Sequence, residues 1–124
     1  MDSNDVRRWV ERYEQAWRSP GTDALAELFI DDATYLVSPW AEPVRGLDAS
    51  RALWESERVG PDEKFTMTSE VVAVDGDVAV VRVEVEYAAT ENRWRDLWLL
   101  RLDDQGMCVA FEEWPFAPDQ PDGH

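Results

Sequence analysis

The sequence predicts an α+β domain in which three helices from the first half of the chain lie on one face of a curved antiparallel sheet. In the first half of the 124 residues, apolar side chains recur every three or four positions, which is the spacing of a buried helix face. In the second half, apolar and polar side chains alternate along four segments that turn signals separate. This pattern is typical of strands joined by hairpins.

Three segments of the first half are expected to be helices. The first has an apolar stripe at helical spacing, made up of Val6, Trp9, Val10, Tyr13 and Trp17. Ser3 is its expected N-cap, because a serine side chain can accept a hydrogen bond from the first turn. After a break at Ser19-Pro20-Gly21, a short helix is expected that Thr22 caps and Asp31-Asp32 ends. A longer helix is expected over residues 47–58, and Gly60-Pro61 ends it.

Five segments are expected to be strands: residues 34–38, 65–74, 78–87, 93–102 and 107–116. Asp75-Gly76-Asp77 and Asp103-Asp104-Gln105-Gly106 have the composition of tight turns, so the last four strands form an antiparallel meander. The whole fold is assigned to residues 1–116. The polar, proline-bearing residues 117–124 are expected to form a flexible tail.

Alternation along the strands predicts which side chains point inward. Two neighbouring strands each have one apolar face, formed by Ala79, Val81, Val83, Val85 and Tyr87 and by Trp94, Asp96, Trp98, Leu100 and Leu102. With Tyr87 paired near Trp94, Asp96 points inward between the rings of Trp94 and Trp98. Burial there would raise the pKa of its carboxyl toward neutrality, as removal of a proton next to a carbonyl group requires.

The pairing of the last two strands decides what lies opposite Asp96. A four-residue hairpin at residues 103–106 pairs Leu102 with Met107. In that register Glu113 lies opposite Asp96 on the inner face, and the like charges raise the pKa of one of the two carboxyls further. A single β-bulge would instead turn the next residue, a tryptophan, to this face, so both registers stay open.

The outer face of the same strands is not fully polar. It carries an apolar strip, which charged residues border and which consists of Leu97, Leu99, Ala110 and Trp114. Contiguous apolar surface of this kind is uncommon on monomers, so the outer strip is expected to be the interface of a homodimer.

The charge balance argues against two classes of partner. Lys and Arg number 12 against 27 Asp and Glu, for a net charge of −15. A surface this acidic repels nucleic-acid phosphates and anionic lipid headgroups. No apolar run approaches the ~20 residues that a membrane span needs, and the protein is expected to be cytoplasmic.

The counts of two residue types limit the chemistry. Cys108 is the only cysteine, which excludes an intramolecular disulfide and a cysteine-cluster zinc site. His124 is the only histidine, which excludes a histidine base or metal ligand in the folded body. Catalysis would therefore fall to carboxylates, tyrosine, arginine or the lone Lys64, and neither a cofactor nor a metal is expected.

The order of the elements and several short motifs resemble those of the nuclear transport factor 2-like superfamily, and most of all its SnoaL-like branch. The residues that carry the resemblance are Tyr13, Leu28-Phe29-Ile30-Asp31-Asp32-Ala33-Thr34-Tyr35, Pro39, Pro43-Val44-Arg45-Gly46, Trp54 and Phe111-Glu112-Glu113-Trp114. The resemblance covers nearly all of the chain except the tail. It implies a cone-shaped fold with three N-terminal helices on the concave face of the sheet, a dimer, and a pocket between helices and sheet.

Known enzymes of the superfamily differ in how well their catalytic residues match this sequence. Tyr13 stands where ketosteroid isomerases have their oxyanion donor, but Ser38 and Trp98 stand where those enzymes have two acids. Limonene epoxide hydrolases need an Arg-x-Asp on one strand, whereas Asp96 alternates to the face opposite the nearby arginines, and scytalone dehydratases rely on histidines. Polyketide cyclases of the SnoaL-like branch use an acidic base, a role that Asp96 or Glu113 can fill.

We therefore expect an apolar pocket for a small hydrophobic molecule. Its expected lining is Tyr35, Trp40, Trp54, Met67, Trp94 and Trp98. If the pocket is catalytic, Asp96 acts as base or acid, Glu113 as its partner and Tyr13 as hydrogen-bond donor. The reaction would be a cofactor-free cyclisation, isomerisation or dehydration of a carbonyl compound. Two other hypotheses stay open: a non-catalytic module that binds a hydrophobic ligand, and a protein-interaction module that uses the outer strip.

Overall fold

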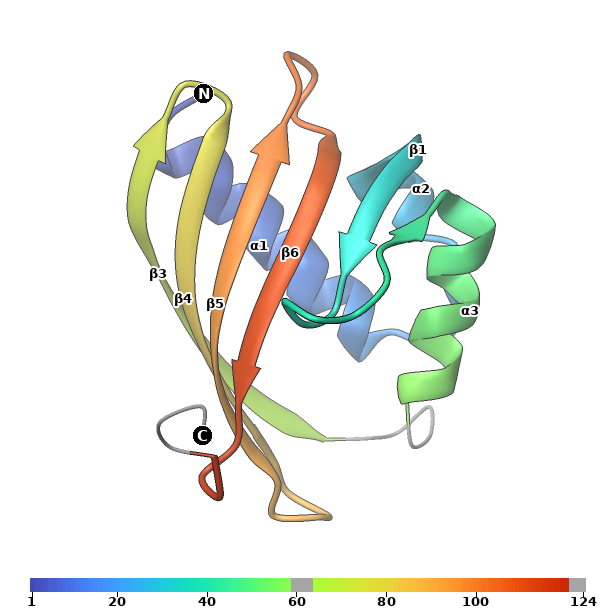
Figure 1. The fold of residues 1–124 in the computed structure, drawn as a ribbon, viewed down its shortest axis with the longest axis vertical. Helices are drawn as coiled ribbons and strands as arrows, with labels where there is room; N and C mark the ends of the chain where they lie inside the picture. Colours follow the sequence, from blue (N-terminus) through green and yellow to red (C-terminus); the bar gives the residue numbers. More distant parts are fainter. Residues whose placement is uncertain (59–63, 121–124) are drawn as a thin grey trace.

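Three helices and six strands form the expected α+β fold in the computed structural model, which describes residues 1–58 and 64–120. They are α1 (Ser3–Arg18), α2 (Leu25–Leu28), β1 (Phe29–Leu36), β2 (Val44–Arg45), α3 (Leu47–Glu57), β3 (Phe65–Asp75), β4 (Val78–Tyr87), β5 (Arg93–Leu102) and β6 (Cys108–Phe116). The strands form one curved, open sheet in the order β2-β1-β6-β5-β4-β3. α1 crosses one face of this sheet, and α2 and α3 contact β1 (Figure 1).

The sheet is mixed rather than wholly antiparallel. β3 to β6 form the expected meander, but β1 pairs in parallel with β6, with Tyr35 beside Phe111. The reason is topological, because the chain leaves β1 through β2, α3 and three more strands before it returns as β6. A crossover of this length can bring a strand back in the same direction, which a tight hairpin cannot.

A capping box fixes the start of α1. The Asp2 side chain accepts a hydrogen bond from the Asp5 backbone N–H at 3.0 Å, and the Asp5 carboxylate accepts one from the Asp2 N–H at 2.8 Å. The N-cap is therefore Asp2, and the prediction of Ser3 is wrong, because the reciprocal pair satisfies two N–H groups at once. The predicted apolar stripe is buried from Val6 to Tyr13.

The second helix is shorter than expected, and the first strand is longer. α2 has four residues, and Phe29 already begins β1. Within β1, Asp31 and Asp32 are exposed while Tyr35 is buried. Pairing with β6 extends this segment, so tertiary contact overrides the local helical pattern.

Two of the expected features lie partly outside the residues that the structure describes. Gly60-Pro61, the expected end of the third helix, lies there, and so do residues 121–124 of the expected tail. The described part of the tail forms a turn in which the Gln120 N–H donates to the Ala117 carbonyl at 2.9 Å. Within residues 1–58 and 64–120, none of the helices is long and apolar enough to cross a membrane.

The sheet keeps the predicted inner face although the expected pairing of the last two strands is wrong. Leu102 pairs with Cys108, one residue later than expected, and a bulge beside this pair shifts the register by one more residue. Glu113 consequently lies opposite Trp98 instead of Asp96. The two shifts add up to an even number, which leaves the side chains beyond the bulge on their predicted faces. Cys108, before the bulge, is shifted by one residue only and lies in the core opposite Leu102.

β4 and β5 show the same even shift. Trp94 lies opposite Val85 instead of Tyr87, whose backbone N–H donates to the Asn92 carbonyl at 2.8 Å. The side chains of β4 that were expected to face inward still do so, because the shift is again two residues.

An aromatic core fills the space between α1 and the concave face of the sheet. Tyr13 stacks on Phe111, with ring centroids 5.5 Å apart and planes 9° apart, and it meets the Trp98 ring edge-on at 4.8 Å. The indole N–H of Trp9 donates to the Leu28 carbonyl at 3.0 Å, which ties α1 to α2. This packing holds α1 against β5 and β6, the strands that carry the candidate site.

Candidate functional site

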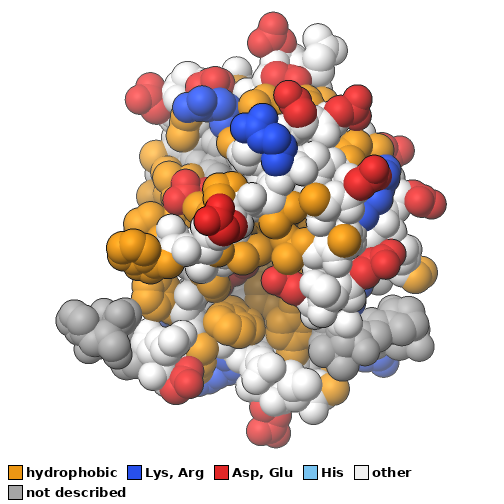
Figure 2. Space-filling model, turned by 45° about the vertical axis from the view of Figure 1, so that its right-hand side comes forward, with side chains coloured by type: hydrophobic (Ala, Val, Ile, Leu, Met, Phe, Trp, Pro, Cys, Tyr) orange, Lys and Arg blue, Asp and Glu red, His pale blue; other side chains and the backbone are white. Residues whose placement is uncertain are grey.

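A cavity of about 340 Å³ lies between α1, the C-terminal end of α3 and strands β3 to β6. Its depth is hydrophobic, and acidic side chains border it (Figure 2). A cavity of this size accommodates a molecule of about one or two rings.

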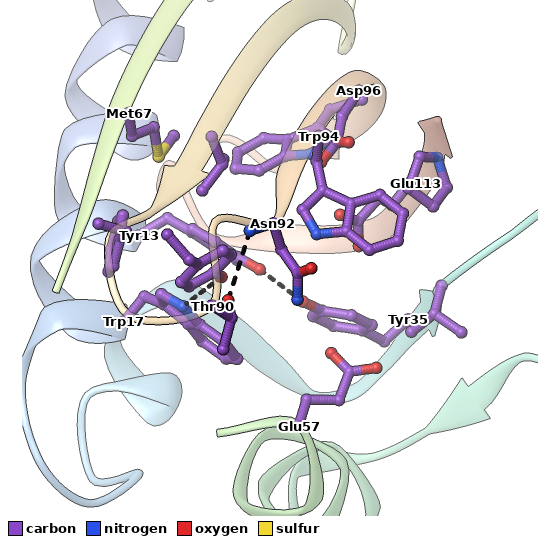
Figure 3. A pocket seen from close by; sticks show the side chains of 16 residues that line it. Tyr13, Trp17, Tyr35, Glu57, Met67, Thr90, Asn92, Trp94, Asp96 and Glu113 are labelled. Atoms are coloured by element: carbon purple, nitrogen blue, oxygen red, sulfur yellow. Dashed lines mark hydrogen bonds between the residues drawn. The ribbon is translucent and has the colours of Figure 1, made fainter. Parts of the chain in front are cut away.

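Asp96 lines this cavity from the inner face of β5 (Figure 3). Only 6% of the residue is exposed, and its Oδ1 atom has no hydrogen-bond partner among the described residues. Desolvation raises the pKa of its carboxyl, while the neighbouring Glu113 and Trp98 side chains offset part of this rise. A buried carboxylate oxygen without a donor is costly, so a ligand that supplies a donor would be stabilised here.

Glu113 lines the same cavity from β6, the strand next to β5. Trp98 is its partner across the sheet, and Asp96 lies two residues from Trp98 along β5. Burial, followed by the proximity of Asp96 and the charge of Glu57, raises the pKa of Glu113 well above its usual value. Burial thus raises the pKa of both carboxyls, and that of Glu113 more, so Glu113 is the one of the two that keeps its proton to the higher pH.

Two tyrosine hydroxyls supply hydrogen-bond donors at the cavity. The Oη atoms of Tyr13 and Tyr35 are 2.6 Å apart, and the indole N–H of Trp54 donates to Tyr35 Oη at 3.3 Å. Burial raises the pKa of both hydroxyls well above its usual value, so both keep their protons. The bond between them uses only one of the two protons, and the other is available to a ligand whichever tyrosine donates.

A third carboxyl group and aromatic rings complete the wall. Glu57 reaches the cavity from the last turn of α3 and lies near Tyr35 in Figure 3. Desolvation raises the pKa of this carboxyl as well. The indole N–H of Trp17 donates to the Tyr87 hydroxyl at 3.1 Å, which joins α1 to β4 across the wall.

Most of the residues expected at the site do line the cavity: Tyr13, Tyr35, Met67, Trp94, Asp96, Trp98 and Glu113. Trp40 does not, because the loop between β1 and β2 leaves the sheet and holds this side chain 98% exposed. Its expected place in the lining is therefore wrong. Trp54 is buried behind Tyr35 and supports its hydroxyl rather than lining the cavity.

Trp17, Glu57 and Tyr87 are among the lining residues that the sequence did not single out as site residues. Alternation did place Tyr87 on the inner face of its strand, and Trp17 belongs to the apolar stripe of α1, so both carried a signal of burial. Glu57 carried none, because one carboxylate among many on a charged helix looks like solvated surface. Only the tertiary fold brings it to the cavity.

Neither a metal cluster nor a reactive thiol is found in the part of the chain that the structure describes. No group of three or more His, Cys, Asp or Glu side chains there could hold a metal ion. Cys108 is buried, and desolvation raises the pKa of its thiol to about 12, so the thiol stays protonated at neutral pH.

The family model of the SnoaL-like domain matches residues 7–111 of this chain, in agreement with the fold and the motifs. The chain belongs to the SnoaL-like domain family. The resemblance that the motifs indicated is thereby confirmed for this SnoaL-like chain. No curated protein was found to match it.

Solved structures share the fold of this SnoaL-like chain at low sequence identity. SalBIII, described as an epoxide hydrolase/cyclase-like enzyme in pyran ring formation in the polyether salinomycin, is 18% identical over 93% of each chain, with a TM-score of 0.74. A candidate polyketide cyclase from Sinorhizobium meliloti is 24% identical over 91% of this chain and 99% of that chain (TM-score 0.69). The S. rosetta CaMKII hub is 18% identical over 94% and 98% (TM-score 0.68). Identities this low establish a common fold, not a common activity.

Proposed function

We propose that this SnoaL-like domain catalyses a cofactor-free acid–base reaction on a small hydrophobic carbonyl compound, namely a cyclisation, an isomerisation or a dehydration. The observation that carries the proposal is the pair of Asp96 and Glu113, two buried carboxyls with raised pKa values side by side at a hydrophobic cavity. The printed names of two solved relatives, a candidate polyketide cyclase and an epoxide hydrolase/cyclase-like enzyme, support this class of reaction.

Each polar side chain has a task in the proposed reaction. In this reaction Asp96 acts in its ionised form and Glu113 in its protonated form. Asp96 takes a proton from the carbon next to the carbonyl group, and the electrons of that C–H bond move into an enolate. The available proton of the Tyr13–Tyr35 pair forms a hydrogen bond with the enolate oxygen, where negative charge develops.

The second half of the reaction uses the proton that Glu113 holds. In an isomerisation this proton goes to another carbon of the enolate, and in a dehydration it goes to the hydroxyl group that leaves as water. In a cyclisation the enolate carbon attacks a second carbonyl group, whose oxygen takes the proton. Proton transfer from Asp96 to its neighbour Glu113 then restores the starting state, so atoms and charge balance without a cofactor.

Proton exchange tests the proposal without knowledge of the natural substrate. Ketones of one or two rings, such as 2-tetralone, exchange the protons next to the carbonyl group for deuterium in D₂O, and NMR measures the rate. Wild-type protein is expected to accelerate this exchange. Asp96→Asn is expected to lower kcat by ~10²-fold or more, the scale of a general base, with ketone affinity unchanged.

A matched control separates the site from the rest of the surface. Glu11→Gln removes a carboxylate from an exposed position of α1 and is expected to keep the wild-type exchange rate. An Asp96→Asn protein that exchanges ketone protons as fast as wild type would contradict the proposal. Tight ketone binding without exchange in any variant would favour the second candidate, a non-catalytic module that binds a hydrophobic ligand, which the aromatic wall also supports.

We also propose that a second copy of the chain covers the outer strip defined above. Leu97 and Trp114 lie opposite each other there and are 37% and 39% exposed. Leu99 and Ala110 beside them are half-buried. Large apolar side chains exposed side by side support an interface between copies of the chain, or with another protein if the domain is an interaction module.

A further inference from the structure

Acidic side chains line the cavity, but no cationic side chain does among the described residues. Three of its lining side chains are carboxyl groups, those of Glu57, Asp96 and Glu113, and none of the described lining residues is a lysine or an arginine. Nor does any of these acids form an ion pair within residues 1–58 and 64–120. The described part of the protein thus leaves the negative charge of the cavity unbalanced.

Two arginines lie beside the wall, and several of their donors bond to backbone groups, although the buried Nε of Arg58 has no partner among the described residues. Arg18 Nη1 donates to the Phe65 carbonyl at 2.7 Å, and Arg58 Nη2 donates to the Ala16 carbonyl at 2.8 Å. Their guanidinium groups lie over rings that line the cavity, 4.0 Å from the Phe65 centroid and 5.1 Å from that of Trp17. Rings of this wall therefore already attract cations through their π faces.

Asp96 provides a buried acceptor atom at the cavity, next to the Glu113 and Trp98 side chains that stabilise its charged form. Its Oδ1 atom is unpartnered, and the residue is 94% buried, given its exposure of 6%. Trp94 and Trp98 flank it along β5 and line the same cavity. A positively charged nitrogen would satisfy both features, because its charge is attracted to the carboxylate and to the electron-rich faces of indole rings.

We infer that the cavity binds a hydrophobic organic cation, whose apolar body packs against the aromatic wall and whose protonated or quaternary nitrogen lies against the carboxyl groups. The inference deepens the proposed function and rests on it for the reaction, since the carbonyl substrate would then carry a basic nitrogen. Carboxylate and phosphate compounds are disfavoured by the same charges. The net charge of −15 adds an attraction for cations that acts over longer distances.

Three probes of similar shape test the inference in the wild-type protein. Phenyltrimethylammonium is a cation, tert-butylbenzene is its neutral isostere, and benzenesulfonate is an anion of similar size. At low ionic strength, ligand-observed NMR is expected to give a dissociation constant at least tenfold lower for the cation than for tert-butylbenzene, with no measurable binding of the sulfonate. A cation that binds no more tightly than the neutral probe, or that does not bind, overturns the inference.

Charge-removing variants locate the effect in the cavity. The pKa values of Asp96 and Glu113 depend on each other, so a single substitution also changes the charge of the carboxyl that remains. The informative variant is therefore the double one, Asp96→Asn with Glu113→Gln. It is expected to weaken cation binding about tenfold and to leave tert-butylbenzene affinity unchanged, and Glu57→Gln is expected to act in the same direction. Glu11→Gln removes one charge outside the cavity and should leave both affinities unchanged. An equal loss in that control would assign the effect to bulk surface charge and overturn the inference.

Binding and catalysis fail separately in these experiments. One outcome is that neutral ketones exchange protons only when Asp96 is present, while the protein shows no preference for the cationic probe. This outcome would refute the inference and leave the proposed function standing. A clear preference for the cation without any proton exchange would refute catalysis and leave the inference standing. If the double variant does not fold, the three probes in wild type and the Glu57→Gln variant still decide.

Discussion

At the scale of single residues, the candidate site depends on two carboxyls that the sequence placed on the correct face. Asp96 and Glu113 were both expected to point inward, because alternation in a strand has a period of two residues. The same reasoning could not reach Glu57, which comes from a helix end, or exclude Trp40, which comes from a loop. Periodicity thus finds site residues in strands and misses those that only the tertiary fold brings in.

The carboxyl pair predicts a particular dependence of stability on pH. Burial raises the pKa values of Asp96 and Glu113 above their ordinary values of 3.8 and 4.5, so above these values the folded chain binds more protons than the unfolded one. Their contribution to the free energy of unfolding therefore falls as the pH rises through this window. Glu113→Gln cannot ionise at this position, so this variant is expected to lose less stability than wild type between pH 5 and 8. The wild-type protein is expected to lose more free energy of unfolding than Glu113→Gln. The extra loss is about 1.4 kcal/mol for each unit by which the fold raises the pKa of Glu113 within this pH range.

Urea denaturation at the two pH values measures this difference. The exposed variant Glu11→Gln serves as the control and is expected to follow the wild-type protein. Parallel pH dependence in the wild-type and Glu113→Gln proteins would show that Glu113 is not held protonated by the fold.

The tyrosine pair predicts that neither hydroxyl alone is essential for catalysis. In Tyr13→Phe or Tyr35→Phe the remaining tyrosine keeps one proton for the ligand, so each single variant is expected to lower kcat for proton exchange by less than about tenfold. The double variant removes both donors and is expected to lower it by ~10²-fold. A single variant as slow as the double one would assign the donor to that hydroxyl alone.

At the scale of helices and strands, the sequence predicted the elements better than their pairing. The bounds of β4 and β5 agree with the prediction, because each is a long alternating segment between turn signals. The registers of β4 with β5 and of β5 with β6 were each displaced by two residues, because turn length and a bulge set the register, and alternation alone determines only which face a side chain takes. The boundary of α2 with β1 was missed because pairing with β6 overrides local preference.

The capping box of α1 predicts a contrast between two neighbouring positions. Asp2→Ala removes the side chain that accepts from the first turn and is expected to lower the melting temperature by roughly 3 °C, the scale of a lost cap in a domain of this size. Ser3→Ala lies inside the helix and is expected to change it little. Thermal unfolding followed by circular dichroism measures both, and an effect of Ser3→Ala alone would restore Ser3 as the cap.

At the scale of the whole molecule, the order of elements and the motifs predicted the family and the fold class, and the structure confirms the fold class. The parallel pairing of β1 with β6 was not predicted, because the two strands are separated by most of the chain and no local pattern reports their contact. The outer strip remains a prediction about the assembly. A stable dimer would bury roughly 1,200–2,000 Å² in total, so the strip would form the centre of a larger interface.

Reversal of one apolar side chain tests the proposed dimer. Leu97→Glu places a charge opposite Trp114 in the outer strip and is expected to raise the dimer dissociation constant by at least about 100-fold, since an unpaired charge at an interface costs several kcal/mol. Sedimentation velocity measures the state of association. Trp40→Ser, which removes an exposed tryptophan outside the strip, should leave it unchanged. A wild-type protein that sediments as a monomer at high concentration would rule out the dimer.

The last strand of the chain, β6, lies between β1 and β5 rather than at an edge of the sheet. During synthesis on a ribosome, the edges of β1 and β5 that face β6 stay unpaired until residues 108–116 have left the exit tunnel. Only then can the backbone N–H and C=O groups of these edges form their hydrogen bonds with β6. During that interval the nascent chain exposes two unpaired strand edges, which are templates for wrong association. The sheet is thus completed only after β6 has emerged, and before that point a chaperone that shields strand edges would be of most use.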